Sequence, residues 1–202
     1  MCQDTWKERQ ECTHMKTRSV LQLTTLGLLI AIGIVIPMVS PFKIVLEPAS
    51  FTLASHVAIF IAMYISPAMA AAVALGTTIG FFLGGFPVVI VARAASHVVF
   101  AATGAYYIQK KSLTEQSGVS LRIFSALIAI IHAVCEVIVV SVFFYEGNMS
   151  TAYYQKGFLI SVLLLVGLGT IVHSMIDFEI AHVVVAALQR EQRFRKLLSR
   201  ED

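Results

Sequence analysis

Six long apolar runs follow one another along this chain and occupy most of its length. A helix needs about 20 apolar residues to cross the hydrocarbon core of a bilayer. Because backbone groups in lipid must be paired within the protein, such runs form helices unless a barrel closes, and the alternating pattern of a barrel is absent. The sequence therefore predicts an all-α integral membrane protein with six transmembrane helices. The runs cover about residues 20–40, 51–66, 68–86, 88–109, 121–145 and 157–188.

The composition excludes several classes of protein. Of the 202 residues, 57% are hydrophobic and only 13% are charged, whereas soluble proteins carry about 25% charged residues. A soluble protein of this size could not bury so much apolar surface, which excludes a water-soluble enzyme, a disordered chain and a nucleic-acid-binding domain. No Walker-type phosphate loop and no GxSxG motif is present, so we expect neither ATP hydrolysis nor enzyme activity from the chain itself.

The positions of Lys and Arg predict the orientation in the membrane, because cytosolic loops are enriched in these residues. With six spans, twelve of them fall on the side of the two termini, while Lys43 and Lys156 fall on the opposite side. Both termini are therefore expected in the cytosol. The twelve are Lys7, Arg9, Lys16, Arg18, Lys110, Lys111, Arg122, Arg190, Arg193, Arg195, Lys196 and Arg200.

The charge pattern also divides the chain into three parts. Residues 1–15 are polar and mixed in charge, and we expect a tail there that can be disordered. Residues 16–190 form the predicted six-helix membrane domain, and residues 191–202 form a basic cytosolic tail. Met15 can serve as the start of the protein as well as Met1.

Ionisable side chains inside the predicted helices gather at one depth. Arg93 and His97 lie four residues apart and share a helix face, as do His132 and Glu136 on the next helix. His56 lies near the start of the second apolar run. The predicted orientation places all five in the outer half of the membrane, where such residues are costly and usually functional. We expect them to line one polar pocket.

The segment between the first two runs is expected to form a lid over this pocket. Residues 41–50 contain two prolines, which stiffen the backbone, together with apolar side chains such as Phe42. His173 and Asp177 share a face of the last helix, but their predicted depth lies nearer the cytosol. For this pair we expect a structural role or a contact with a partner in place of a position in the pocket.

Arg93 indicates what the pocket can hold. A guanidinium binds a carboxylate through two parallel hydrogen bonds, so the pocket suits a small anionic or zwitterionic ligand with an apolar body. Arg93 can instead pair with Glu136 in a structural network, and His132 with Glu136 can act as acid and base of an intramembrane enzyme. The histidines are metal-ligand types, but a cation beside Arg93 is unfavourable, so no metal site is predicted. A solitary secondary carrier or metal transporter using the His/Glu cluster stays the alternative function.

Small residues mark one face of the first predicted helix. Gly27 and Ala31 lie four residues apart, and such pairs let another helix approach closely. The helix is otherwise almost free of polar side chains. This face is therefore predicted to meet either lipid or another membrane protein.

These features resemble the substrate-binding S component of an energy-coupling factor (ECF) vitamin transporter. The likeness lies in the basic N-terminus, the six predicted helices, the small residues of the first helix and the structured outer loop. Residues 36–45 (IPMVSPFKIV) and 49–56 (ASFTLASH) are similar to members assigned to niacin or pantothenate. The resemblance covers about residues 16–190 and does not decide between the two vitamins, both of which carry a carboxylate.

The resemblance implies partners and a mode of action. A transmembrane coupling subunit and two cytosolic ATPases supply the energy, and the first helix docks on the coupling subunit, here through Gly27 and Ala31. The vitamin binds on the outer side and is released inside when the S component topples in the membrane. No cofactor is implied, and the location is the bacterial cytoplasmic membrane.

Mapped onto this chain, Phe42, Lys43 and Glu47 of the outer loop join the polar cluster as candidate binding residues. The start of the sixth run adds Tyr153, Tyr154 and Phe158.

Overall fold

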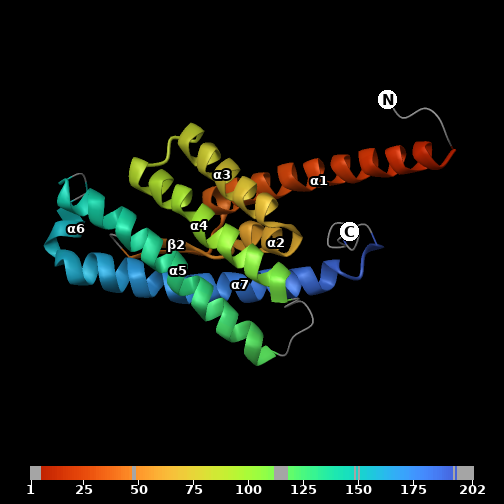
Figure 1. The fold of residues 1–202 in the computed structure, drawn as a ribbon. Coiled ribbons are helices and arrows are strands. Elements are labelled where there is room, and N and C mark those ends of the chain that lie inside the picture. Colours follow the sequence, from red (N-terminus) through yellow and green to blue (C-terminus); the bar gives the residue numbers. More distant parts are fainter. Residues whose placement is uncertain are drawn as a thin grey trace.

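The computed structural model of the chain is a bundle of long helices with one small β-hairpin (Figure 1). It describes residues 6–46, 49–111, 118–147, 149, 151–192 and 194. Within these ranges, only the backbone is described for residues 6–18, 43–46, 49–50 and 152. The helices are α1 (Trp6–Val39), α2 (Val57–Ile65), α3 (Pro67–Leu83), α4 (Val88–Lys111), α5 (Gly118–Tyr145), α6 (Thr151–Gln155), the π-helical segment η2 (Leu159–Leu168) and α7 (Gly169–Leu188).

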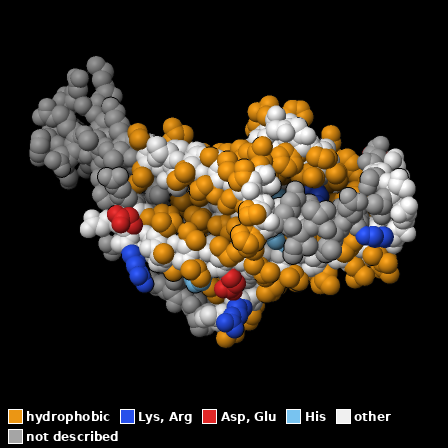
Figure 2. Space-filling model, turned by 180° about the vertical axis from the view of Figure 1, so that it is seen from behind, with side chains coloured by type: hydrophobic (Ala, Val, Ile, Leu, Met, Phe, Trp, Pro, Cys, Tyr) orange, Lys and Arg blue, Asp and Glu red, His pale blue; other side chains and the backbone are white. Residues whose placement is uncertain are grey.

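Four helical segments of the described chain are long and apolar enough to cross a membrane. They are Ser19–Val39, Val88–Lys111, Gly118–Tyr145 and Leu159–Leu188. The face drawn in Figure 2 is covered mainly by hydrophobic side chains, with charged groups at a few places. The prediction of an all-α multi-pass membrane protein is confirmed. The prediction that the chain crosses the membrane six times stays a prediction.

The second apolar run does not form one helix. Its first residues form a strand, so the prediction that the second helix starts near residue 51 is wrong. Strands β1 (Lys43–Leu46) and β2 (Ala49–Thr52) pair antiparallel, with Lys43 opposite Thr52. The β-branched and aromatic residues of these segments favour extended backbone over helix. The segment that is expected to form a lid is therefore a β-hairpin. Helix α2 begins only at Val57, after a turn in which Ala54 has a positive φ of 68°.

The short helix α2 forms the centre of the bundle. All nine of its residues are buried, as expected for a helix that is apolar on every side. Its Phe60 ring packs against Phe100 of α4 and Phe178 of α7, at centroid distances of 5.7 and 5.3 Å. At about 1.5 Å per residue it spans only about half of the hydrocarbon core. Its N-terminus lies inside the bundle, where His56 is buried next to the buried Asp177 of α7.

One face of α1 packs against α3, and the other is open. Gly76 and Gly80 of α3 leave room for Ile30 and Ile34, whose side chains occupy the space that a Cβ would need. Gly27 and Ala31 are exposed, and nothing described lies within 4 Å of a Cβ added to Gly27. The N-terminal end of α1 and the C-terminal end of α7 lie at the same end of the molecule (Figure 1). The predicted cytosolic location of that end stays a prediction.

Candidate ligand-binding site

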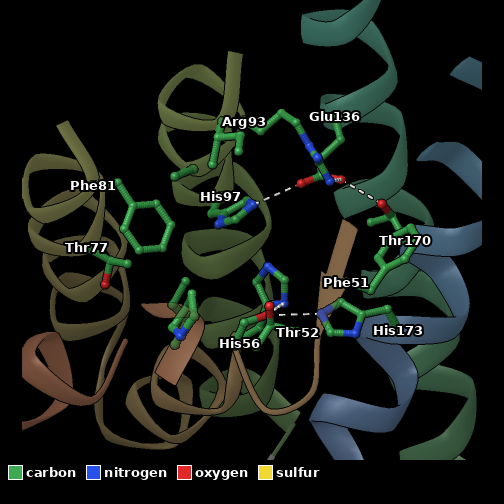
Figure 3. A pocket seen from close by; sticks show the side chains of 15 residues that line it. Phe51, Thr52, His56, Thr77, Phe81, Arg93, His97, Glu136, Thr170 and His173 are labelled. Atoms are coloured by element: carbon green, nitrogen blue, oxygen red, sulfur yellow. Dashed lines mark hydrogen bonds and ion pairs between the residues drawn. The ribbon is translucent and has the colours of Figure 1, made fainter. Parts of the chain in front are cut away.

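A small cavity lies inside the bundle, where the β2–α2 turn meets α3, α4, α5 and α7. Its volume is about 90 Å³, and Figure 3 shows polar side chains of several elements pointing toward it. The polar lining residues are Thr52, Ser55, His56, Thr77, Arg93, His97, Glu136, Thr170 and His173, and the apolar ones are Pro37, Phe51, Ile59, Phe81, Ile90 and Ala94. The cavity thus combines a charged wall with an aromatic and aliphatic one.

Glu136 of α5 is the centre of the charged wall. Arg93 Nη2 donates to its Oε2 at 2.8 Å, and Thr170 Oγ1 donates to the same oxygen at 2.6 Å. His97 Nε2 lies 3.2 Å from Oε1, and His132 Nε2 lies 3.6 Å from it. A buried carboxylate needs this degree of pairing, because desolvation of an unpaired charge costs several kcal/mol.

Arg93 is paired but not saturated. Its recorded bond to Glu136 uses Nη2, while the buried Nε has no hydrogen-bond partner in the described chain. A guanidinium carries five N–H donors in a planar fork. The side chain also lines the cavity and is 14% exposed. Pairing with Glu136 and binding of a ligand anion are therefore compatible, although the sequence presented them as alternatives.

His173 corrects the expectation that it lies away from the pocket, whereas Asp177 does not line the cavity and makes contacts of the structural kind that was expected. Asp177 of α7 accepts hydrogen bonds from the backbone N–H groups of Ala54 and His56, at 2.7 and 2.9 Å, and lies 3.1 Å from His56 Nδ1. His173 lines the cavity, and its Nε2 lies 3.0 Å from Ser55 Oγ. Because α2 starts deep in the bundle, the turn before it reaches the middle of α7.

His132 lies behind the cavity and does not line it. The side chain is fully buried and stacks on Phe100 at a centroid distance of 4.1 Å. Its Nδ1 lies 3.3 Å from Ser174 Oγ. Its ring is also close to those of His56 and His97, with centroids 4.7 Å apart in each case.

The candidate residues of the outer loop either do not line the cavity or are not among the residues that the structure describes. Phe42 is exposed and lines a separate apolar groove of about 630 Å³, beside Phe51, which borders both spaces. The Lys43 side chain and Glu47 lie outside the described residues. Tyr154 bonds the Phe144 carbonyl at 3.1 Å and is not among the residues that line the cavity. Tyr153 and Phe158 also do not line it.

Several lining residues carry no signal in the sequence. The hydroxyls of Thr52, Thr77 and Thr170 enter the cavity wall from three elements. Hydroxyl residues in apolar helices commonly bond to their own backbone, as Thr103 Oγ1 does to the Val99 carbonyl at 2.7 Å. Nothing in the pattern separates the two cases.

Comparison with known proteins gives one informative match. No family model matches the chain, and no solved structure matches it. The chain is 41% identical over 178 residues to the niacin transporter NiaX of Lactococcus lactis subsp. cremoris (strain MG1363), a match that covers 87% of this chain and 78% of that protein. The predicted resemblance is therefore confirmed, and the chain, a multi-pass protein of the cell membrane, belongs to the family of NiaX among the S components of ECF vitamin transporters.

Proposed function

We propose that this chain is the substrate-binding subunit of an ECF-type importer for niacin, which it binds as the nicotinate anion. The observation that carries the proposal is the partly buried guanidinium of Arg93, which lines a cavity and whose Nε has no hydrogen-bond partner among the described residues. Its fork suits a carboxylate, and the name of the relative points to the same vitamin.

The two walls of the cavity have separate tasks in this proposal. Glu136 holds Arg93 in place and balances its charge while the site is empty. Nicotinate then brings its carboxylate to the free side of the guanidinium, and its flat ring lies between Phe51 and Phe81. Pantothenate, the other vitamin that the sequence suggested, is longer and more flexible, so a cavity of about 90 Å³ favours niacin.

Energy for import comes from partners in this proposal. The chain docks through the exposed α1 face of Gly27 and Ala31 on a transmembrane coupling subunit, which is joined to two ATPases. The end of the bundle where α1 begins and α7 ends faces the cytosol, because the predicted orientation puts most Lys and Arg residues of the sequence on that side. Niacin is captured at the opposite side and released inside.

Binding by the purified chain tests the substrate. We expect nicotinate to bind, nicotinamide to bind weakly because it lacks the carboxylate, and pantothenate not to compete. Arg93→Ala should weaken nicotinate binding by about 10–100-fold, the equivalent of one charged hydrogen-bonded contact of about 1.5–3 kcal/mol. Arg122→Ala, a change at an exposed arginine of α5, is the matched control. Equal affinity of the Arg93 variant and the control would contradict the proposal.

Reconstitution tests the dependence on partners. Liposomes that contain only this chain should not accumulate nicotinate, whereas liposomes with the coupling subunit, both ATPases and ATP should. Accumulation by the chain alone would instead support the solitary carrier.

A further inference from the structure

Three buried histidine rings from three segments meet at the wall of the cavity, two of them lining it and the third behind them. They are His56 at the start of α2, His97 of α4 and His132 of α5. Their ring centroids are 4.7–4.8 Å apart in every pair. One ring nitrogen from each residue lies within 4.8 Å of the corresponding atoms of the other two. Imidazole nitrogens gathered in this way are typical of a transition-metal site.

Each ring is also held by a polar partner. His56 Nδ1 lies 3.1 Å from an Asp177 oxygen, and His97 Nε2 lies 3.2 Å from a Glu136 oxygen. His132 Nδ1 lies 3.3 Å from Ser174 Oγ. Metal-binding histidines almost always have such a partner, which fixes the orientation of the ring.

One nitrogen of the cluster lacks a hydrogen bond. His132 Nε2 is buried and has no hydrogen-bond partner in the described chain, its nearest recorded contact being the Glu136 oxygen at 3.6 Å. A buried polar atom without a partner costs about 1–3 kcal/mol. A metal ion bound at this atom would remove that cost.

The charges around the cluster favour a cation. From the sequence, the positive charge of Arg93 made a metal site unfavourable. In the structure this charge is offset by Glu136, because Arg93 Nη2 lies 2.8 Å from Glu136 Oε2. Asp177 adds a second buried carboxylate, and its recorded ion-pair partners are histidines. With neutral imidazoles, the described groups of this cluster carry one excess negative charge.

We propose that His56, His97 and His132 form a binding site for one divalent first-row transition-metal ion, such as Zn²⁺ or Co²⁺. Metal–nitrogen bonds are about 2.0–2.1 Å long, so the three rings move closer together when the ion binds. His56 and His97 also line the cavity, which leaves a fourth coordination position on that side. The inference does not rest on the proposed niacin function.

Metal titration of the purified full-length chain, without vitamin and without a polyhistidine tag, tests the site. After chelator treatment and dialysis, we expect one equivalent of Zn²⁺ or Co²⁺ to bind, with visible Co²⁺ absorption bands, and metal to raise the thermal midpoint. His97→Gln and His132→Gln should each weaken binding by at least about 100-fold. Ser174→Ala, which leaves all three rings in place, should weaken it by about 10–100-fold.

Control variants separate this site from other histidines. His182→Gln changes a histidine of α7 that contacts Tyr64 and lies outside the cluster, so it should leave metal binding unchanged. His173→Gln tests the neighbouring group of His56, His173 and Asp177. The proposal is overturned if no metal binds, if His182→Gln weakens binding as much as His132→Gln does, or if His173→Gln abolishes binding while His97→Gln does not. Because no vitamin is present, none of these results bears on niacin binding.

Discussion

Two buried carboxylates in the same bundle, Glu136 and Asp177, accept hydrogen bonds from different kinds of group. Glu136 accepts its recorded hydrogen bonds from side chains, above all the guanidinium of Arg93, and it lines the cavity. Asp177 accepts hydrogen bonds from the backbone of Ala54 and His56. Glu136 is thus held by side chains alone in its recorded hydrogen bonds, whereas Asp177 also holds the backbone of the turn before α2.

The difference separates a feature of the fold from a feature of the site. The N-terminus of α2 has no side-chain cap of its own, and Ala54 before it has a positive φ, which is uncommon for a residue other than glycine. Asp177, on another helix, accepts from the N–H of His56 at this N-terminus and from the N–H of Ala54 in the turn before it, next to the positive end of the helix dipole. We therefore expect changes at Asp177 to act on stability and changes at Glu136 to act on ligand binding as well.

Asp177→Ala should have the largest effect. It removes the partner of two backbone N–H groups and of His56 at once, so we expect the free energy of unfolding to fall by about 3–5 kcal/mol. Thermal unfolding in detergent measures the loss. Glu179→Ala, an exposed acidic residue on the same helix, should change stability by less than about 0.5 kcal/mol. Similar losses in both variants would remove the assigned role of Asp177.

Glu136→Gln should destabilise the empty protein by about 1–3 kcal/mol, because the partly buried Arg93 charge loses its charged partner. Saturating nicotinate supplies a new carboxylate, so it should raise the thermal midpoint of this variant more than that of the unmodified protein. Asp177→Asn should show no such recovery. If nicotinate stabilised both variants equally, the two carboxylates would not differ in the way described.

Gly169→Ala should act on the aromatic wall. A Cβ at this position would lie 2.5 Å from Cζ of the Phe51 ring, so the ring must shift at the edge of the cavity. Overpacking of this kind costs about 1–3 kcal/mol, and we expect nicotinate affinity to fall by about 5-fold or more. Isothermal titration measures it. Gly27→Ala, where nothing described lies within 4 Å of the added carbon, is the control and should bind normally.

Gly27→Leu and Ala31→Leu should have the smallest effect on the isolated chain. Both positions are exposed, so stability and nicotinate affinity should stay within about 0.5 kcal/mol of the unmodified protein. Co-purification with the coupling subunit should fall, because a large side chain prevents close helix approach. Unimpaired assembly of both variants would show that this face is not the docking surface.

Helix periodicity made part of the site predictable. A spacing of four residues places Arg93 with His97, and His132 with Glu136, on shared faces, and the structure brings these pairs together. The four long apolar segments were predictable for a different reason, because length and hydropathy decide them.

The depth of residues was not predictable from the runs alone. Counting six full spans placed His173 and Asp177 near the cytosol, but α2 has only nine residues and begins inside the bundle. The apolar run predicts a helix that includes residues 51–56, although Phe51 and Thr52 are also good strand formers. Hydrophobicity reports burial, and it does not distinguish a short strand from the start of a helix.

A double-mutant cycle between protein and ligand tests the central claim most directly. The four affinities needed are those of nicotinate and nicotinamide for the unmodified protein and for Arg93→Lys, which keeps the charge but loses the planar fork. If Arg93 holds the vitamin carboxylate, the loss from Arg93→Lys will be at least about tenfold greater for nicotinate than for nicotinamide, a coupling of about 1.4 kcal/mol or more. Equal losses for the two ligands would mean that Arg93 serves Glu136 and the bundle, and that the carboxylate is bound elsewhere.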